Sequence, residues 1–254
     1  MFDPDKPIFI AGPCAIEQME ILEQVATELV RLRKALDIQI VFKSSFDKAN
    51  RTSIASYRGV GLKQGMQMLA AIKERYHLPI TTDIHEPFQA GEVAGVVDVI
   101  QIPAFLCRQT DLLVAAARTG RVVNIKKAQF LSGEDMKYPV GKVVESGNPH
   151  VWLTERGNSF GYNNLVVDFR NIPTMLRHTP RVIMDCTHSV QRPGSGNGVT
   201  GGDREFIPAM ALAAKAFGAN GFFFEVHPDP DKALSDGPNT LRLDQLETVI
   251  RSLL

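Results

Sequence analysis

The stretch Ile38-Gln-Ile-Val-Phe42 runs directly into Lys43-Ser-Ser-Phe-Asp-Lys-Ala-Asn-Arg-Thr-Ser53, and this junction is the most informative part of the chain. The first five residues have the apolar, β-branched character of a buried strand. The next eleven contain two lysines and an arginine beside amide and hydroxyl side chains. Lysine supplies a compact charge and arginine a bidentate fork, so the segment is typical of a site for phosphorylated substrates. A solvated basic loop is the alternative interpretation.

Short apolar runs of the same kind recur along the 254 residues and predict eight strands, at 7–11, 38–42, 79–84, 97–102, 122–125, 150–153, 181–184 and 221–224. Amphipathic stretches separate most of them and predict helices, for example at 20–36, 61–76, 110–119, 206–217 and 243–254. Alternating strands and helices predict βαβ units with a parallel sheet. Eight such units in a chain of this length predict an α/β fold, a (β/α)8 TIM barrel that forms a single domain over residues 1–254. A doubly wound open sheet is the alternative.

The composition excludes several classes of protein. Lys plus Arg and Asp plus Glu are 28 each, so the net charge is zero, and neither nucleic acid nor a membrane surface is an expected partner. No apolar run reaches the ~18 residues of a membrane span, and the first residues lack the pattern of a signal peptide. Three cysteines do not make a disulfide framework. We therefore expect a cytoplasmic protein with reduced thiols.

Polar side chains follow every predicted strand: Cys14, Lys43, Asp83 and His85, Gln101, Asn124 and Lys126, Thr154 and Arg156, Asp185 and His188, and Glu225 and His227. In a TIM barrel the carboxyl ends of the strands meet at one face, where active sites lie. Residues two apart along a strand share a side, so the members of a pair such as Asp83 and His85 are expected to point the same way. Buried polar groups are costly without partners, and this convergence therefore predicts a functional site.

Five cations are expected at this face, namely Lys43, Lys48, Arg51, Lys126 and Arg156. They predict a polyanionic occupant with two phosphates, or with a phosphate and a carboxylate. The chain has neither a Walker loop nor a G-x-G-x-x-G motif after a strand, so a nucleotide is not expected. The loops after the seventh and eighth strands carry little positive charge, which places the phosphates elsewhere than in many barrels.

A second group consists of Cys14, His188, Glu225 and Asp236. The first and last strands adjoin in a closed barrel, so these residues can meet. Thiolate, imidazole and carboxylate ligands suit Zn²⁺ or Fe²⁺ better than Mg²⁺. The alternative is that Cys14 is a packed thiol and His188 a capping or core histidine.

The remaining candidates are weaker. His85 and His227 are each expected to orient a ligand or to serve the structure, and Cys107 and Cys186 are expected to pack in the core. Residues 191–202 contain five glycines and are expected to form a mobile lid over the site, with a plain connection as the alternative.

Nearly the whole chain resembles the 3-deoxy-D-manno-octulosonate 8-phosphate synthases. The motifs that carry the resemblance are Ala-Gly-Pro-Cys at 11–14, Phe-Lys-Ser-Ser-Phe-Asp-Lys-Ala-Asn-Arg at 42–51, Thr-Asp-Ile-His-Glu at 82–86, Gln-Ile-Pro-Ala-Phe-Leu-Cys-Arg-Gln-Thr-Asp at 101–111, Asn-Ile-Lys-Lys at 124–127, Thr-Glu-Arg-Gly at 154–157, Phe-Gly-Tyr-Asn-Asn-Leu-Val-Val-Asp at 160–168, Asp-Cys-Thr-His-Ser-Val-Gln at 185–191 and Ser-Asp-Gly-Pro at 235–238. The resemblance implies a barrel enzyme that condenses phosphoenolpyruvate with D-arabinose 5-phosphate and water for lipopolysaccharide biosynthesis, with release of phosphate. Two phosphorylated substrates fit the five cations.

The resemblance also implies roles for particular residues. The residues that would hold phosphoenolpyruvate are Lys43, Lys48, Gln101, Lys126 and Arg156. Asn50 and Arg51 would bind arabinose 5-phosphate, with Thr52 and Ser53 near its phosphate. The family more often has Ser at position 52, and the hydroxyl is kept here. The arginine of this motif reaches a neighbouring subunit's site in the family, which implies a homotetramer.

The family has metal-independent members, with Asn where this chain has Cys14, and metal-dependent members, which share Ser235 before Asp236. The resemblance thus implies the metal-dependent class, with Cys14, His188, Glu225 and Asp236 as ligands of Zn²⁺ or Fe²⁺, ahead of Mn²⁺. Cys14, Lys43, Asp83 and His188 are the predicted catalytic residues. Asp83 and His188 are preferred to His85 for contacts to the sugar or for proton transfer.

Two alternatives are open. The related 3-deoxy-D-arabino-heptulosonate 7-phosphate synthases use erythrose 4-phosphate and usually carry Lys-Pro-Arg-Thr where this chain has Lys48-Ala-Asn-Arg51, so Asn50 favours the five-carbon sugar. Sialic-acid synthases are more distant. A non-catalytic protein that binds metal or phosphate on a barrel scaffold is the other alternative, because barrels host many functions.

Overall fold

Eight parallel strands form a closed barrel in the computed structural model, which describes residues 2–160, 164–196 and 199–254. The strands are β1 (Ile8–Gly12), β2 (Gln39–Lys43), β3 (Ile80–Asp83), β4 (Val99–Ile102), β5 (Val122–Lys126), β6 (Val151–Glu155), β9 (Val182–Asp185) and β12 (Gly221–His227). They lie side by side in chain order, and β12 pairs with β1 from Ile8↔Gly221 to Gly12↔Glu225, which closes the ring. Each overlaps a predicted strand, so the predicted TIM barrel is confirmed and the open sheet is not formed.

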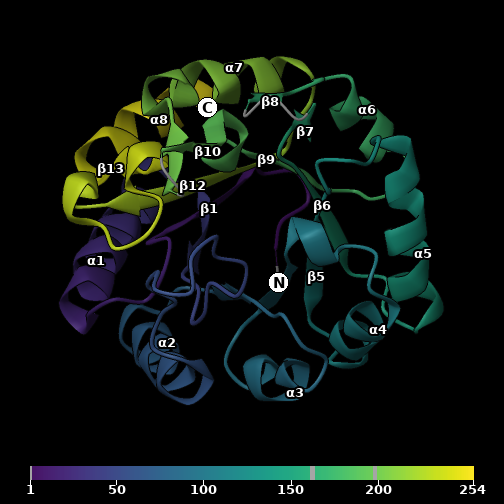
Figure 1. Ribbon diagram of the computed structural model, residues 1–254, viewed down its shortest axis with the longest axis horizontal. Coiled ribbons are helices and arrows are strands. Elements are labelled where there is room, and N and C mark those ends of the chain that lie inside the picture. The colour runs from purple at the N-terminus through teal and green to yellow at the C-terminus, as the bar shows by residue number, and fades with distance from the viewer. Residues whose placement is uncertain (1, 161–163, 197–198) are drawn as a thin grey trace.

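Helices surround the barrel as an outer ring (Figure 1). They are α1 (Met19–Leu36), α2 (Leu62–Tyr76), α3 (Gln89–Ala94), α4 (Thr110–Arg118), α5 (Lys137–Glu145), α6 (Asn171–Met175), α7 (Ile207–Ala216) and α8 (Leu246–Leu253). Five of them overlap the predicted helices. The helices α3, α5 and α6 are not among the predicted examples. Helices α3 and α6 have only six and five residues, too few for a clear apolar period, and α5 contains Pro139 and Gly141, which are poor helix formers.

Two apolar cores hold the layers together. The larger core lies between the strands and the helices. The smaller one fills the amino-terminal half of the barrel and consists of Ile8, Ile10, Val41, Val99, Trp152, Ile183 and Phe223. Phe2 packs edge-on against Trp152, with the ring centroids 5.0 Å apart. This apolar floor leaves only the carboxyl-terminal half of the barrel for polar side chains.

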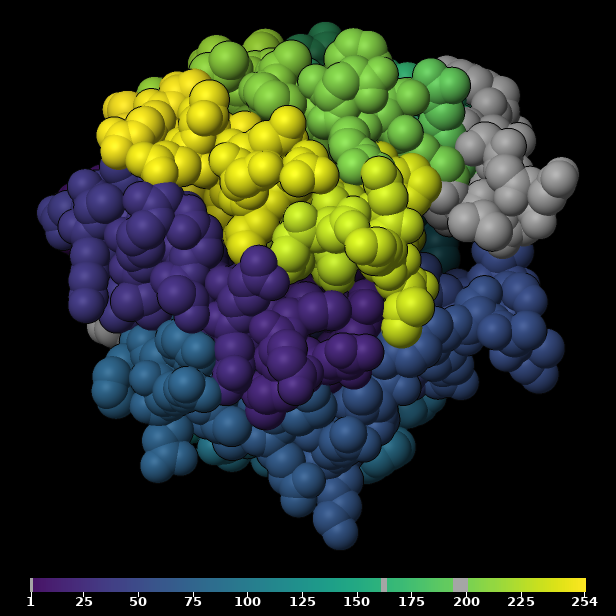
Figure 2. Space-filling view, turned by 90° about the vertical axis from the view of Figure 1, so that its left-hand side faces the viewer, coloured from purple at the N-terminus to yellow at the C-terminus, as the bar shows by residue number. Residues whose placement is uncertain are grey.

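Closure of the ring brings the first and last parts of the chain together. Figure 2 shows the purple N-terminal segment beside the yellow C-terminal segment on one side of the molecule. A further short strand, β13 (Leu241–Arg242), pairs with the end of β12. At the end of β1 a Cβ on Gly12 would lie 1.8 Å from the Lys43 carbonyl oxygen, so only glycine permits this approach of β1 to β2.

Two antiparallel hairpins form two-stranded sheets that are separate from the barrel. Strands β7 (Asn158–Ser159) and β8 (Leu165–Val166) form one, and β10 (Gln191–Gly196) and β11 (Val199–Gly202) form the other. The predicted lid at 191–202 is therefore a paired hairpin rather than a plain loop, although its residues 197–198 lie outside the described part. Its motion stays a prediction.

Nowhere in the described chain does a helix have the length and apolar character needed to cross a bilayer.

Candidate active site

A cavity of about 900 Å³ opens at the carboxyl ends of the strands. The predicted site residues that line it are Lys43, Lys48, Asn50, Arg51, Thr52, Asp83, Gln101, Lys126, Arg156, His188 and Asp236. Cys14 and Glu225 lie buried next to it, with exposures of 4% and 0%. The fold thus brings together residues that are more than 200 positions apart in sequence.

Two predicted residues lie apart from this cavity. Ser53 is exposed and is not among the lining residues, and its hydroxyl accepts a hydrogen bond from the Ala55 amide. His227 is buried, its Nδ1 accepts a hydrogen bond from the Asp229 amide, and its Nε2 lies 4.0 Å from Glu17. We therefore assign His227 a structural role, which was one of its two expected roles.

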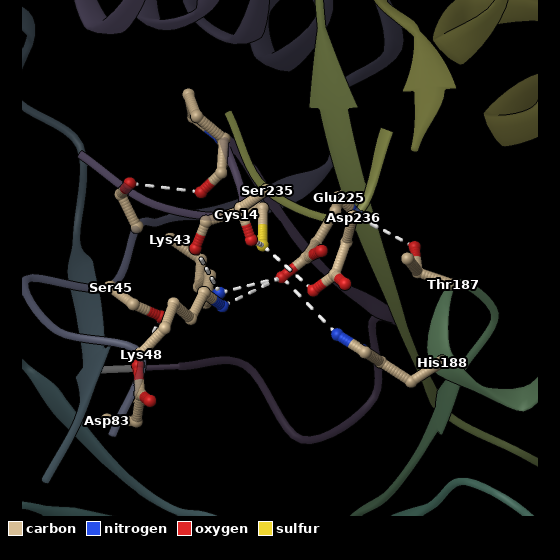
Figure 3. A network of polar contacts seen from close by, with 12 residues as sticks. Cys14, Lys43, Ser45, Lys48, Asp83, Thr187, His188, Glu225, Ser235 and Asp236 are labelled. Carbon is tan, nitrogen blue, oxygen red and sulfur yellow. Dashed lines mark hydrogen bonds and ion pairs between the residues drawn. The ribbon is translucent and has the colours of Figure 1, made fainter. Parts of the chain in front are cut away.

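Three predicted metal ligands form a compact group. The donor atoms of Cys14, Glu225 and Asp236 all lie within 4.8 Å of one another (Figure 3). The pairing of β1 with β12 sets Cys14 beside Glu225, and Asp236 arrives from the loop that follows β12. Asp236 has a positive φ of 51°, a conformation that aspartate tolerates better than most residues. A thiol and two carboxylates fit a divalent metal such as Zn²⁺ or Fe²⁺.

His188 stands at the edge of this group. Its Nε2 is 3.5 Å from Glu225 Oε1, but the ring is not part of the compact set of three donors, in contrast to the predicted four. The reason is Asp185, whose Oδ2 lies 2.8 Å from His188 Nδ1 and holds the ring from the other side. The carboxylate beside Nδ1 orients the ring so that Nε2 faces Glu225. The sequence marked Asp185 only as a strand end.

The Cys14 thiol lies in a polar but enclosed environment. Its sulfur is 2.8 Å from the Ser235 hydroxyl and 3.2 Å from Asp236 Oδ2. Burial, reinforced by the negative charge of Glu225, raises the pKa of the Cys14 thiol well above its usual value. The thiol therefore keeps its proton until a cation displaces it. Ser235, which the sequence indicated only as a class feature, is a direct neighbour of the proposed ligand.

Metal affinity should consequently rise with pH. Below the raised pKa of Cys14, each ion bound through the thiolate releases one proton, so affinity increases about tenfold per pH unit. Competition with a chromophoric chelator between about pH 7 and 8.5, corrected for the chelator's own protonation, measures this slope. A Cys107→Ser variant, which loses a buried thiol outside the site, should keep it. A pH-independent affinity would contradict thiolate ligation.

The cations of the cavity are paired with carboxylates. Lys43 Nζ lies 2.9 Å from Glu225 Oε1, with Lys48 Nζ 3.5 Å from the same oxygen. Lys126 Nζ lies 2.6 Å from Asp185 Oδ2 and 4.0 Å from the centre of the Phe223 ring. The five predicted cations therefore face four carboxylates: Asp83, Asp185, Glu225 and Asp236. One excess positive charge is left, which a divalent cation bound through the Cys14 thiolate would raise to two.

Asp83 is held as a carboxylate. Burial alone would raise its pKa, but His85, Lys48 and Lys43 together lower the pKa of Asp83 well below its usual value. Its Oδ2 lies 3.1 Å from His85 Nε2, and the Ser45 hydroxyl donates to Oδ1. His85 lines the cavity as well and orients Asp83, whereas the ligand-orienting role considered for it stays a prediction.

Arg156 offers an unused donor to the cavity. Its Nη2 donates to Gln191 Oε1 at 2.8 Å and to the His188 carbonyl at 3.3 Å. Within the described chain, its Nη1 is buried and has no hydrogen-bond partner, and Gln101 Oε1 is in the same situation. Buried polar atoms without partners are costly, so these two atoms indicate a ligand that completes the site.

Arg51 serves its own chain's cavity in this structure. Its guanidinium contacts the Ser235 hydroxyl, and its Nη1 lies 3.4 Å from Asp236 Oδ1. The Asp236 carboxylate attracts the guanidinium in this direction. The reach into a neighbouring subunit's site, which the resemblance implied, stays a prediction. Cys107 and Cys186 lie buried in the outer apolar core, as expected for packing residues.

The fold and the cavity define a barrel enzyme with a site for anionic substrates beside a potential metal centre. Residues 3–253 match the DAHP synthetase I family, and the chain belongs to this family.

Its relatives include several proteins named 2-dehydro-3-deoxyphosphooctonate aldolase. The one from Nitratidesulfovibrio vulgaris strain DP4 is 56% identical over 244 residues, which are 96% of this chain and 89% of the relative. The one from Desulfatibacillum aliphaticivorans is 53% identical over 247 residues, 97% and 90% of the two chains. The one from Granulibacter bethesdensis is 53% identical over 253 residues, 99% and 90%.

Proposed function

We propose that this chain condenses phosphoenolpyruvate with D-arabinose 5-phosphate and water to give 3-deoxy-D-manno-octulosonate 8-phosphate and phosphate, the activity of 2-dehydro-3-deoxyphosphooctonate aldolases. The observation that carries this function is the cavity itself, in which buried cations and the unpartnered Arg156 Nη1 surround a space for two anions. The name of the relatives at 52–56% identity supports the same reaction. The heptulosonate synthases are related only at the level of the family.

The chain would bind the two substrates with different residues. Lys43, Gln101, Lys126 and Arg156 are deep in the cavity and would hold the carboxylate and phosphate of phosphoenolpyruvate. Lys48, which shares Glu225 Oε1 with Lys43, would hold phosphoenolpyruvate as well. Residues 50–52 line the outer part of the cavity and would hold the sugar phosphate, with Ser53 a weaker candidate because it lies outside the lining. Cations on both sides screen the repulsion between the two substrates and keep the reacting carbons in contact.

The reaction then follows from this arrangement. C3 of phosphoenolpyruvate attacks the aldehyde carbon of the sugar, water adds at C2, and the hemiketal phosphate breaks at its C–O bond to release phosphate. Asp83 stays ionised and can hold a sugar hydroxyl or accept a proton. His188, held by Asp185, can take part in proton transfer near Glu225 when its Nε2 does not coordinate a metal ion. Lys43 stabilises negative charge that develops beside it.

We further propose that Cys14, Glu225 and Asp236, with His188 as a fourth ligand, hold a divalent metal ion. Zn²⁺ or Fe²⁺ suits this donor set best, and Mn²⁺ is the next candidate. Such an ion would supply Lewis-acid chemistry, either polarising the aldehyde or lowering the pKa of a water. The buried Glu225 Oε2 has no hydrogen-bond partner among the described residues, which supports a missing ligand there.

Three further proposals rest on the resemblance and the composition. They are a cytoplasmic location, a homotetramer, and a single catalytic domain over residues 1–254 whose product feeds lipopolysaccharide biosynthesis. Sedimentation analysis of the purified chain tests the tetramer.

Phosphate release tests the proposed reaction. Purified protein with phosphoenolpyruvate and arabinose 5-phosphate should release phosphate, lose this activity after chelation, and regain it with Zn²⁺, Fe²⁺ or Mn²⁺. Erythrose 4-phosphate in place of the pentose should give little release. Activity with erythrose 4-phosphate alone would move the chain to the heptulosonate synthases. Full activity in protein that contains no metal would keep the reaction and remove the metal proposal.

A further inference from the structure

A buried ion pair lies directly behind the cavity, on the outer side of the barrel wall. Lys127 and Glu155 have no exposed surface, and Lys127 Nζ is 3.4 Å from Glu155 Oε1. Each directly adjoins a cavity cation in sequence, Lys127 next to Lys126 and Glu155 next to Arg156. Because successive residues at a strand end alternate in direction, the pair points away from the cavity while its neighbours line it.

Glu155 controls the backbone of Arg156. Its Oε1 accepts hydrogen bonds from the amide of Arg156 at 2.8 Å and from the amide of Gly157 at 2.6 Å. Gly157 has a φ of 89°, a left-handed conformation that glycine adopts without strain. The carboxylate therefore fixes a sharp turn at the very point where the Arg156 side chain leaves the chain.

Lys127 ties together the two loops that follow β5 and β6. Its ammonium group lies 3.1–3.3 Å from three carbonyl oxygens, those of Ala128, Leu131 and Gly157, and 3.0 Å from Asn158 Oδ1. Its own amide donates to the Thr154 carbonyl at 2.8 Å. One ammonium group thus joins the segment after Lys126 to the segment after Arg156.

Burying this ion pair costs more free energy of desolvation than burying apolar side chains in the same place. Burial lowers the pKa of Lys127, and the Glu155 carboxylate opposes that shift. Apolar side chains of similar volume would often stabilise the fold as well or better, because two charges lose their hydration. Stability alone therefore does not explain the pair, whereas fixing two loops at defined positions requires directional contacts.

We propose that Lys127 and Glu155 are positioning residues that hold Arg156, and with it Lys126, in the geometry that binds phosphoenolpyruvate. This inference rests on the proposed function. Neither residue touches the cavity, so both act through the cations beside them. Arg156 Nη1 has no hydrogen-bond partner among the described residues, and a fixed backbone turn would hold it in position to meet a planar anionic group.

The test compares the substrate dependence of variants. Lys127→Met and Glu155→Ala should raise the KM for phosphoenolpyruvate about tenfold, while kcat, the KM for arabinose 5-phosphate and the metal content change by less than about threefold. Glu155→Gln keeps an oxygen that can accept the two amide hydrogen bonds, so it should recover most of the affinity. Phosphoenolpyruvate binding measured directly by calorimetry should follow the same order.

A matched control lies at the other end of the barrel. Lys73 Nζ is 2.8 Å from Asp98 Oδ1, and Asp98 Oδ2 also accepts the Ile80 amide at the start of β3. The Lys73 side chain is 36% exposed, so Lys73→Met should change thermal stability little and should not change the KM for phosphoenolpyruvate. The double variant Lys127→Met/Glu155→Leu removes both buried charges, so it should recover thermal stability relative to Lys127→Met and still bind phosphoenolpyruvate weakly.

The outcomes distinguish a positioning role of Lys127 and Glu155 from a purely structural one. If the affinity for phosphoenolpyruvate recovers together with stability in the double variant, or never changes in folded Lys127→Met and Glu155→Ala, the pair is structural and the inference is wrong. The unmodified protein is assayed first. If it releases no phosphate with arabinose 5-phosphate, the proposed function fails, and calorimetry with phosphoenolpyruvate still decides whether the pair positions Arg156.

Discussion

Replacement of Cys14 by serine should remove most of the bound divalent metal and lower kcat about a hundredfold or more. The alcohol of serine ionises far less readily than a thiol, so the group of Cys14, Glu225 and Asp236 would lose its only soft, anionic sulfur ligand. Metal analysis of the purified variant, together with phosphate release at saturating substrates and added metal, measures both effects.

A matched control separates the ligand from the thiol. Cys107 is equally buried but lies in the outer core, and Cys107→Ser should keep metal and activity even if it lowers stability. A Cys14→Ser protein that is free of metal and fully active would contradict the metal mechanism and return Cys14 to a packing role.

Replacement of Arg156 by methionine should lower kcat/KM for phosphoenolpyruvate about a hundredfold or more, because truncating a buried charged hydrogen-bonding partner costs about 2–5 kcal/mol. The guanidinium is 5% exposed and presents the unpartnered Nη1. The metal content should change little, since among the described residues Arg156 makes no hydrogen bond or ion pair with the three grouped ligands and contacts His188 only at its carbonyl oxygen. Steady-state kinetics at varied phosphoenolpyruvate and fixed, saturating pentose phosphate give the value.

Arg204 provides the comparison for this prediction. It lines the same cavity, but its side chain is 30% exposed and pairs with Asp231 at 2.9 Å. Exposed ion pairs contribute little, so Arg204→Met should change kcat/KM by less than about fivefold. An equal loss in both variants would mean that the cavity responds to total charge rather than to the defined position of Arg156.

Much of the fold could be predicted from the sequence because its signals are local. A parallel strand buried on both sides is an apolar run, and a helix that covers a barrel has an apolar stripe. The segments at 38–42 and 20–36 show these patterns clearly, and both form the expected elements as β2 and α1. Helix α6 has five residues, and five residues are too few to display a period.

Part of the candidate site could be predicted because polar residues at the ends of the strands indicate it. Lys43, Asp83 and Lys126 end their strands, and Gln101 is the next-to-last residue of β4. All four line the cavity because parallel strands in a closed barrel end at the same face. Thr52 and Ser53 are adjacent in sequence, yet only Thr52 reaches the cavity. The path of an irregular loop depends on contacts with distant segments, which no local pattern records.

The sequence by itself determined the eight-fold alternation, the barrel that follows from it, and the set of cations and candidate ligands at its mouth. Only the tertiary structure decided how these charges are paired. It set Asp185 between Lys126 and His188, Ser235 against Cys14, and Lys127 against Glu155 behind the wall. The physical reason is that secondary structure depends mainly on neighbours in sequence. The free energy of a buried charge depends instead on the opposite charges and dipoles that the closed fold brings within a few ångströms of it.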